Sequence, residues 1–178
     1  MRKYSQIADS DLLSLMKQNN SSALNELFDR YFIPLCRFSY KYLWTKELCE
    51  EAVSDIFVNL WLKRGIIEIS TSVKAYLYKS VRNQSLNYVK KFNRQNIETK
   101  SVEELELAGR DNFVMDFENN EEIENILMTL PERRKLVFKM SRIDGLKYSE
   151  IAEILSISVN TVQNHITEAV KSILANKK

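Results

Sequence analysis

The sequence predicts an all-α protein of two small helical domains joined by an acidic flexible linker. Only 3 Gly and 2 Pro occur among 178 residues, where average usage would give roughly 12 and 9. A β-sandwich, a barrel or a Rossmann-type sheet needs more turn residues than that. Hydrophobic residues make up 44% of the chain and charged residues 28%, a composition that is typical of a globular, largely helical protein. The third observation is a division of the charge into three blocks.

The charge blocks predict the domain organisation. Residues 1–95 carry 15 basic and 9 acidic side chains (net +6), residues 96–124 carry 2 and 10 (net −8), and residues 125–178 carry 9 and 5 (net +4). Two basic blocks around an acidic one are expected of two modules that approach a polyanion. A charged surface loop within one domain is the alternative for the middle block, but the segment is long for such a loop.

We therefore expect domains at residues 1–95 and 123–178, with a linker at residues 96–122. The linker has little apolar periodicity, apart from a short helix expected at Ser101, where Glu104 completes a capping box. Its composition favours a solvated, flexible tether.

Four helices are predicted before the linker from apolar residues at three- and four-residue spacing. Pro34 lies within the second and could kink it. The first is expected to begin after Ser10 and the second at Ser21. The third is expected to span residues 45–64 and the fourth residues 72–92.

The fourth helix carries the first functional pattern, because no acidic residue occurs between Ile69 and Ile97. Cations bind phosphate strands, and aromatic faces stack on unpaired bases. Alternatively, the aromatic residues pack into the core and the cations form a solvated face; Val73, Leu77 and Val81 must face inward in either case. The polar candidates for nucleic-acid contact are Lys79, Arg82, Asn83, Asn87, Lys90 and Lys91, and the interleaved aromatic residues are Tyr76, Tyr78, Tyr88 and Phe92.

The pattern of residues 148–167 predicts a helix-turn-helix. Ile151, Ala152 and Leu155 form the inner face of its first helix, and Ser158 is a good N-cap for its second helix. A helical hairpin without a DNA role is the alternative. The polar residues left pointing outward, of the types that contact base edges and phosphates in the major groove, are Asn160, Thr161, Gln163, Asn164, Thr167 and Lys171.

Catalytic, metal and membrane functions have little support in the sequence. His165 is the single histidine, the three glycines form no phosphate loop, and Cys36 and Cys49 have no metal-ligand or disulfide spacing. No stretch approaches the roughly 18 to 20 apolar residues of a membrane helix, and the N-terminus does not resemble a secretion signal. We therefore expect a cytoplasmic, non-enzymatic protein without a cofactor, a metal or direct membrane insertion.

In the order of its parts, the chain resembles the sigma factors of bacterial RNA polymerase, in particular the two-domain extracytoplasmic-function (ECF) group of the sigma-70 family. Four segments carry the resemblance, and they occur in the family's order. They are residues 23–31, residues 50–61 (Glu-Glu-Ala-Val-Ser-Asp-Ile-Phe-Val-Asn-Leu-Trp), residues 75–88, and residues 130–138 continued by the helix-turn-helix.

The resemblance implies a role for each part. The first domain corresponds to sigma region 2, in which Asp55, Asn59 and Trp61 would contact the coiled coil of the polymerase's largest subunit. Its fourth helix would recognise and melt the minus-ten element, and the loop over residues 65–72 would capture a flipped base. The second domain corresponds to sigma region 4, which would read the minus-thirty-five element as duplex.

The resemblance also implies a regulatory partner and two local departures from the family. An anti-sigma protein, in some members anchored in the membrane, would inhibit the factor. Ser156 replaces the usual turn glycine and must adopt an uncommon backbone geometry, and Lys147 replaces the usual Ser or Thr cap.

Two other classes of function remain as alternatives. A self-standing helix-turn-helix regulator would need a sensor or dimerisation pattern in the N-terminal half, and the sequence shows none. A helical adaptor without nucleic-acid contact would leave the acid-free stretch from Ile69 to Ile97 unexplained.

Overall fold

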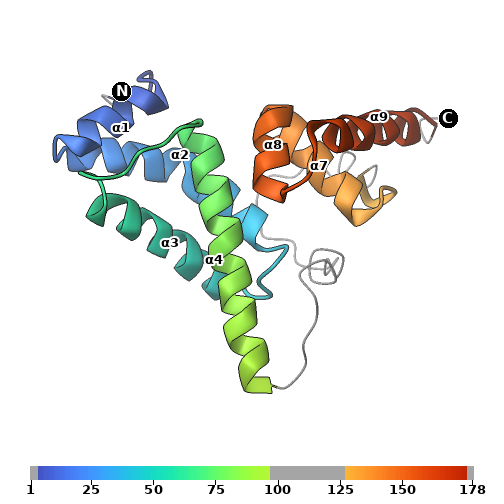
Figure 1. The fold of residues 1–178 in the computed structure, drawn as a ribbon, viewed down its shortest axis with the longest axis horizontal. Helices are drawn as coiled ribbons and strands as arrows, with labels where there is room; N and C mark the ends of the chain where they lie inside the picture. The colour runs from blue at the N-terminus through green and yellow to red at the C-terminus, as the bar shows by residue number, and fades with distance from the viewer. Residues whose placement is uncertain (1–3, 97–126, 176–178) are drawn as a thin grey trace. The chain divides into compact units, whose positions relative to one another are not determined.

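The computed structural model of the chain describes residues 4–96 and 127–175 (Figure 1). The chain divides into two compact units, Met1–Thr99 and Lys100–Lys178. Seven α-helices have their bounds within the described residues, which contain no strand. The all-α prediction is confirmed, while the expected linker beyond its first residue, including its short helix, lies outside the described residues.

The N-terminal unit contains the four predicted helices. Helix α2 packs against the other three, and α3 and α4 also pack against each other. The helix α2 continues through Pro34 rather than ending there. The bounds are α1 Asp9–Lys17, α2 Ser21–Ser39, α3 Lys46–Leu62 and α4 Val73–Asn96.

Side-chain caps begin three of these helices. The Thr45 hydroxyl accepts the N–H of Leu48 at 3.2 Å, and the Ser72 hydroxyl accepts the N–H of Ala75 at 3.0 Å. Asn20 caps α2 in the same way through its Oδ1. Each cap satisfies a backbone donor that the first helical turn leaves without a partner, which is why these polar residues define the starts of the helices.

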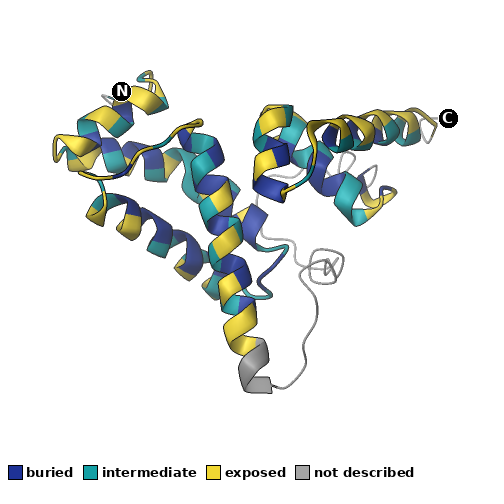
Figure 2. Cartoon of the chain, viewed as in Figure 1, coloured by how far each residue is buried: buried dark blue, intermediate teal, exposed yellow. Residues whose placement is uncertain are grey.

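The core of this unit lies between the apolar stripes of the helices (Figure 2). Val73, Leu77 and Val81 of α4 are buried, as predicted. The ring of Tyr78, which is also fully buried, lies 5.0 Å from the ring of Phe38 in α2. Aromatic burial of this kind contributes a large apolar area to a small core and fixes α4 against α2.

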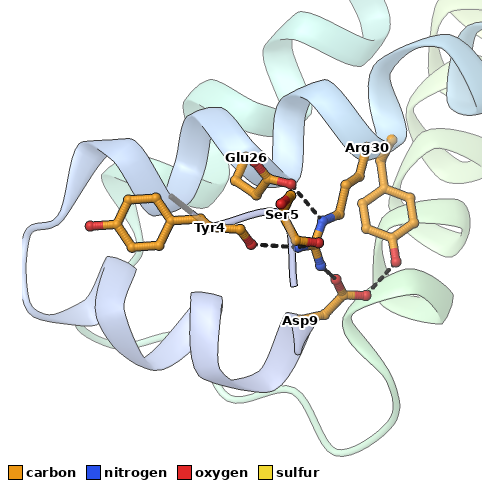
Figure 3. Close-up of polar contacts among 6 residues, drawn as sticks. Tyr4, Ser5, Asp9, Glu26 and Arg30 are labelled. Atoms are coloured by element: carbon orange, nitrogen blue, oxygen red, sulfur yellow. Dashed lines mark hydrogen bonds and ion pairs between the residues drawn. The ribbon is translucent and has the colours of Figure 1, made fainter. Parts of the chain in front are cut away.

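A polar network around Arg30 joins the start of the chain to α2 (Figure 3). The guanidinium donates to Glu26 at 3.0 Å and to Asp9 at 2.8 Å, and its second terminal nitrogen donates to the carbonyl oxygens of Tyr4 and Ser5. The Glu26 side chain is only 9% exposed. A carboxylate this buried requires a charged partner. Arg30 supplies that charge and so stabilises the N-terminal unit.

In the C-terminal unit, three helices have both of their ends within the described residues. Helix α7 packs against α8 and α9, and α8 packs against α9. Leu127, Leu130 and Ala169 form a small core, against which Phe138 and Ile173 pack. The bounds are α7 Glu132–Arg142, α8 Tyr148–Leu155 and α9 Val159–Ala175.

In the described part of the chain, none of the helices combines the length and apolar character that crossing a membrane requires.

Candidate nucleic-acid interface

The helix-turn-helix is built from α8, a tight turn and α9. Ser156 ends α8 with φ 56° and ψ 44°, so the predicted left-handed geometry at this non-glycine position is confirmed. The hydroxyl of Ser158 then accepts the N–H of Thr161 at 3.0 Å and caps α9, also as predicted. At the other end of α8, the N–H of Lys147 donates to the Glu150 carboxylate at 2.8 Å. Glu150 therefore supports a helix start at which Lys147 provides no side-chain cap.

The outward face of α9 holds the six polar residues predicted to meet duplex DNA. Val162 and Ile166 are buried against the rest of the unit and fix the orientation of the helix. Thr161 is half-buried, and its hydroxyl lies 2.8 Å from that of Ser158. The five exposed members of the set are Asn160, Gln163, Asn164, Thr167 and Lys171. Lys171 also pairs with Glu168 at 2.8 Å.

His165, on the same helix, is half-buried and faces the arginines of α7. Burial first, and then the charges of Arg133 and Arg134, lower the pKa of His165 below its ordinary value of 6.5. The unfolded chain therefore binds a proton at this histidine more readily than the folded chain does. The neutral imidazole is the form that the fold accommodates.

We expect α9 to loosen as the pH falls from 7.5 to 5.5. The stabilisation associated with the lowered pKa of His165 is complete above about pH 6.5 and is lost as the pH falls toward the folded-state pKa. The pKa of Glu168 is also lowered, from 4.5, by its hydrogen bond to Lys171, so Glu168 stays ionised throughout this range. Amide hydrogen exchange of α9 at the two pH values, corrected for intrinsic rates, measures the effect. His165→Gln should abolish the difference, and an unchanged pH dependence in that variant would assign it to another group.

The outer face of α4 holds the polar residues predicted to meet melted DNA. Lys79, Asn83, Asn87 and Lys90 fall within about 80° of one another around the helix axis, and all four are exposed, as is Lys91. Arg82 lies to one side of this face and is half-buried. The exposed cations and amides thus form one strip along α4.

Three of the four aromatic residues of α4 have partners within the unit, which favours the alternative that they pack into the core, whereas Tyr76 is half-buried and falls at the same angle around the helix as the strip. Tyr78 is fully buried, and the hydroxyl of Tyr88 lies 3.0 Å from Glu51 and 3.2 Å from Asp55 in α3. Phe92 is 46% exposed, but its ring lies 4.9 Å from that of Trp44. These side chains mainly attach α4 to its neighbours, because each has a partner within the unit.

The loop after α3 presents one apolar side chain to solvent. Ile66 is 82% exposed, whereas its neighbour Ile67 is buried. Gly65, where the third helix was expected to end, follows the last helical residue, Leu62, by three positions.

On α3, the three predicted polymerase contacts differ in their surroundings. Asn59 is exposed, whereas Asp55 is half-buried and accepts hydrogen bonds from α4. Trp61 is half-buried, and the Arg64 guanidinium lies over its ring at 4.2 Å from the centroid, a cation–π contact.

Sequence reasoning missed two apolar residues next to these contacts. Val58 is 56% exposed and Leu62 is 69% exposed, one helical turn apart. They look like core residues in the sequence, and only the phase of the buried stripe would have placed them outside.

Within the described ranges, no group of three or more histidine, cysteine or carboxylate side chains is placed to hold a metal ion. Cys36 and Cys49 are both buried, free thiols. Burial, and then the neighbouring Cys49 and Glu50, raise the pKa of Cys36 to about 12, so this thiol is protonated and unreactive at neutral pH.

Comparison with known proteins identifies both halves of the chain. Residues 27–95 match the family model for Sigma-70 region 2, and residues 120–173 match the one for Sigma-70, region 4. The chain is 24% identical over 179 residues to the ECF RNA polymerase sigma-E factor of Escherichia coli K12, with 94% of this chain and 93% of the relative covered. It is 22% identical to the ECF RNA polymerase sigma factor SigW of Bacillus subtilis, with 85% and 87% covered.

Two solved structures share the fold. One is CnrH in complex with the cytosolic domain of CnrY, with a TM-score of 0.59, 18% identity, and 94% of this chain and 95% of the other covered. The second is the sigma factor RpoE in complex with the anti-sigma factor NepR from Bartonella quintana, with a TM-score of 0.57, 16% identity, and coverage of 84% and 92%.

Proposed function

Because the chain belongs to the ECF group of the sigma-70 family of RNA polymerase sigma factors, we propose that it directs bacterial core RNA polymerase to specific promoters and promotes DNA opening there. The observation that carries this function is the match of both halves to sigma regions 2 and 4 in the family's order. Sigma factors initiate transcription as subunits of the polymerase, so this chain itself needs no catalytic site. We place its action in the cytoplasm, where the polymerase and the promoters are.

The two exposed polar faces have different tasks in this function. The strip on α4, with Lys79, Asn83, Asn87 and Lys90, would hold melted strands near the minus-ten element, because cations and amides bind backbone and base edges of unpaired DNA. Arg82 and Lys91 flank this strip. We assign the remaining candidates, on α9, to the minus-thirty-five duplex, which a helix enters through the major groove.

The domain boundaries follow the same division. Residues 1–95 would form the polymerase-binding and melting domain, residues 96–122 the acidic linker, and residues 123–178 the duplex-binding domain. Two modest contacts on one polymerase give specificity through their sum.

The polymerase would dock on α3 through Asp55, Asn59 and Trp61. The exposed Val58 and Leu62 extend this proposed surface with an apolar part. An apolar patch that includes an aromatic residue and has polar residues at its rim is typical of protein interfaces.

An anti-sigma protein is the second proposed partner, inhibitory and in some relatives anchored in the membrane. A complex of this kind is known for the sigma factor RpoE, which shares the fold and was solved with the anti-sigma factor NepR. Exposed aliphatic side chains of the C-terminal unit, including Val170 and Leu174 one turn apart on α9, offer an apolar surface for such a partner.

The proposed function is tested by adding the purified full-length chain to bacterial core RNA polymerase and a randomised promoter pool. Enriched templates should share two sequence elements at a fixed spacing, and transcription from them should require the chain. If the folded chain neither binds active core polymerase nor supports transcription, the function is wrong. Binding of duplex DNA by the chain alone would then favour a self-standing helix-turn-helix regulator.

Asp55→Ala and Trp61→Ala are each expected to weaken binding to core polymerase by about fivefold or more, the loss typical of a central interface side chain. Hydrogen exchange in α7, α8 and α9 should remain unchanged, because both residues lie in the other unit. A titration of labelled chain with core polymerase measures the affinity. Asn25→Ala, an exposed polar position on α2, is the matched control and should bind like the wild type. Unchanged affinity in both variants would contradict the assignment of α3.

A further inference from the structure

Four polar side chains join α3 to α4. The hydroxyl of Tyr88 lies 3.0 Å from the Glu51 carboxylate and 3.2 Å from that of Asp55, and the amide of Gln84 donates to Asp55 at 3.5 Å. Each helix contributes two residues four positions apart, which places them on one face of that helix. We name these four residues the α3–α4 link.

The link contains one phenol proton and two carboxylates that can accept it. A tyrosine hydroxyl donates a single hydrogen bond, so Tyr88 satisfies Glu51 or Asp55 at any moment but not both. Burial first, and then both carboxylates, raise the pKa of Tyr88, so the phenol keeps its proton at neutral pH. The carboxylate that does not hold the phenol is available to a cation from outside, since Glu51 is exposed and Asp55 is half-buried.

Tyr88 also lies on a face of α4 that is attached to the rest of the unit. Gln84, Tyr88 and Phe92 follow one another at four-residue spacing, and Phe92 packs on Trp44 one turn beyond the link. This anchored face is nearly opposite the one that carries Asn83 and Lys90. Together with the buried Leu86 and Val89, Tyr88 thus helps to hold the second half of α4 in the orientation in which Asn83 and Lys90 are exposed.

We infer that Tyr88 is a positioning residue that keeps the promoter-opening helix in place while core polymerase engages Asp55. The Tyr88 hydroxyl lies within hydrogen-bond distance of both carboxylates before docking. On docking it donates to Glu51 alone, and the phenol keeps its proton. Glu51 is the reserve acceptor, meaning that it keeps the hydrogen bond of Tyr88 when Asp55 binds another group. Asp55 can therefore bind a cationic partner while Tyr88 still joins α4 to α3. The inference rests on the proposed function and adds to it a link between docking and opening.

The test uses full-length Tyr88→Phe, Glu51→Ala and a matched control, Glu47→Ala. Glu47 is an exposed acid one turn before Glu51 on α3, so the control removes the same charge from the same helix without touching Tyr88. Two quantities are measured for each variant: the affinity for core polymerase, and the rate of open-complex formation on a promoter selected with the wild-type chain.

Tyr88→Phe should keep its core affinity within about twofold of wild type and open the promoter about three- to tenfold more slowly. Glu51→Ala should slow opening in the same direction, and Glu47→Ala should open the promoter at the wild-type rate. The Tyr88→Phe substitution should slow opening less in the Glu51→Ala background than in the wild-type background. The reason is that Glu51→Ala has already removed the alternative acceptor of the Tyr88 hydroxyl. A merely structural role would instead lower core affinity and opening together, which this pair of measurements separates.

Opening by Tyr88→Phe at the wild-type rate, or equal opening by Glu51→Ala and Glu47→Ala, would overturn the inference. So would a parallel loss of core affinity and opening in Tyr88→Phe. Should Tyr88→Phe fail to fold, the comparison of Glu51→Ala with Glu47→Ala decides alone, because both positions are exposed. Failure of the wild-type chain to open any promoter would instead contradict the proposed function, and the inference with it.

Discussion

Replacement of Arg30 by alanine is expected to destabilise the N-terminal unit by about 2–4 kcal/mol, somewhat below the usual cost of breaking a buried ion pair because Arg30 is partly exposed. The substitution leaves the carboxylate of Glu26, which is 9% exposed, without its cation, and it removes the bonds to Asp9. Both tryptophans, Trp44 and Trp61, lie in this unit. Urea unfolding followed by tryptophan fluorescence therefore reports its stability directly.

A second variant separates charge burial from packing at this site. Glu26→Gln in the Arg30→Ala background should recover a substantial part of the loss, because no uncompensated charge then remains buried. Lys46→Ala is the matched control, since it breaks an exposed ion pair to Glu50 at 3.7 Å in the same unit. It should change stability by less than about 0.5 kcal/mol. Equal effects of Arg30→Ala and Lys46→Ala would show that the network contributes no more than a surface pair.

The double substitution Asn160→Ala and Gln163→Ala should largely abolish discrimination at the minus-thirty-five element. Both side chains are exposed on α9, and each good contact to a base edge contributes about 1–3 kcal/mol of discrimination. We therefore expect a loss of about 30-fold or more in preference for the selected promoter. The measurement compares the rate of transcription from that promoter with the rate from a promoter whose minus-thirty-five element has been scrambled.

The affinity of this double variant for core polymerase should stay at the wild-type value, because the proposed docking surface lies on α3. Gln18→Ala with Asn25→Ala is the matched control, with the same two residue types at exposed positions of the N-terminal unit. A double variant that retains the full promoter preference would show that α9 does not read the element through these amides.

The helix-turn-helix illustrates what local chemistry makes predictable. Ser158 caps α9, and Ser156 takes up the left-handed conformation that its place in the turn requires. A cap joins residues three positions apart, and a turn constrains single residues. The sequence therefore holds all the information that such features need.

The aromatic residues of α4 illustrate the opposite case. In the sequence, Tyr78, Tyr88 and Phe92 have the same relation to the surrounding cations, and stacking on DNA and packing in the core are equally plausible. Their environments differ because α2, α3 and the segment around Trp44 meet different parts of the helix. Helical periodicity gives the angle of a side chain around its axis, but it does not say which neighbour meets it.

Composition, periodicity and short motifs are enough to predict the helical class, the helix starts, the inward apolar stripes and the family, because each of these is encoded within a few neighbouring residues or in the chain as a whole. The Arg30 network and the α3–α4 link became visible only once the helices were packed. Arg30 and Asp9 are 21 positions apart, and Tyr88 and Glu51 are 37 positions apart. No local pattern pairs residues at such separations, since their contact depends on how whole helices pack. The polar contacts that, in our proposal, connect polymerase docking to promoter opening thus exist only in the tertiary structure.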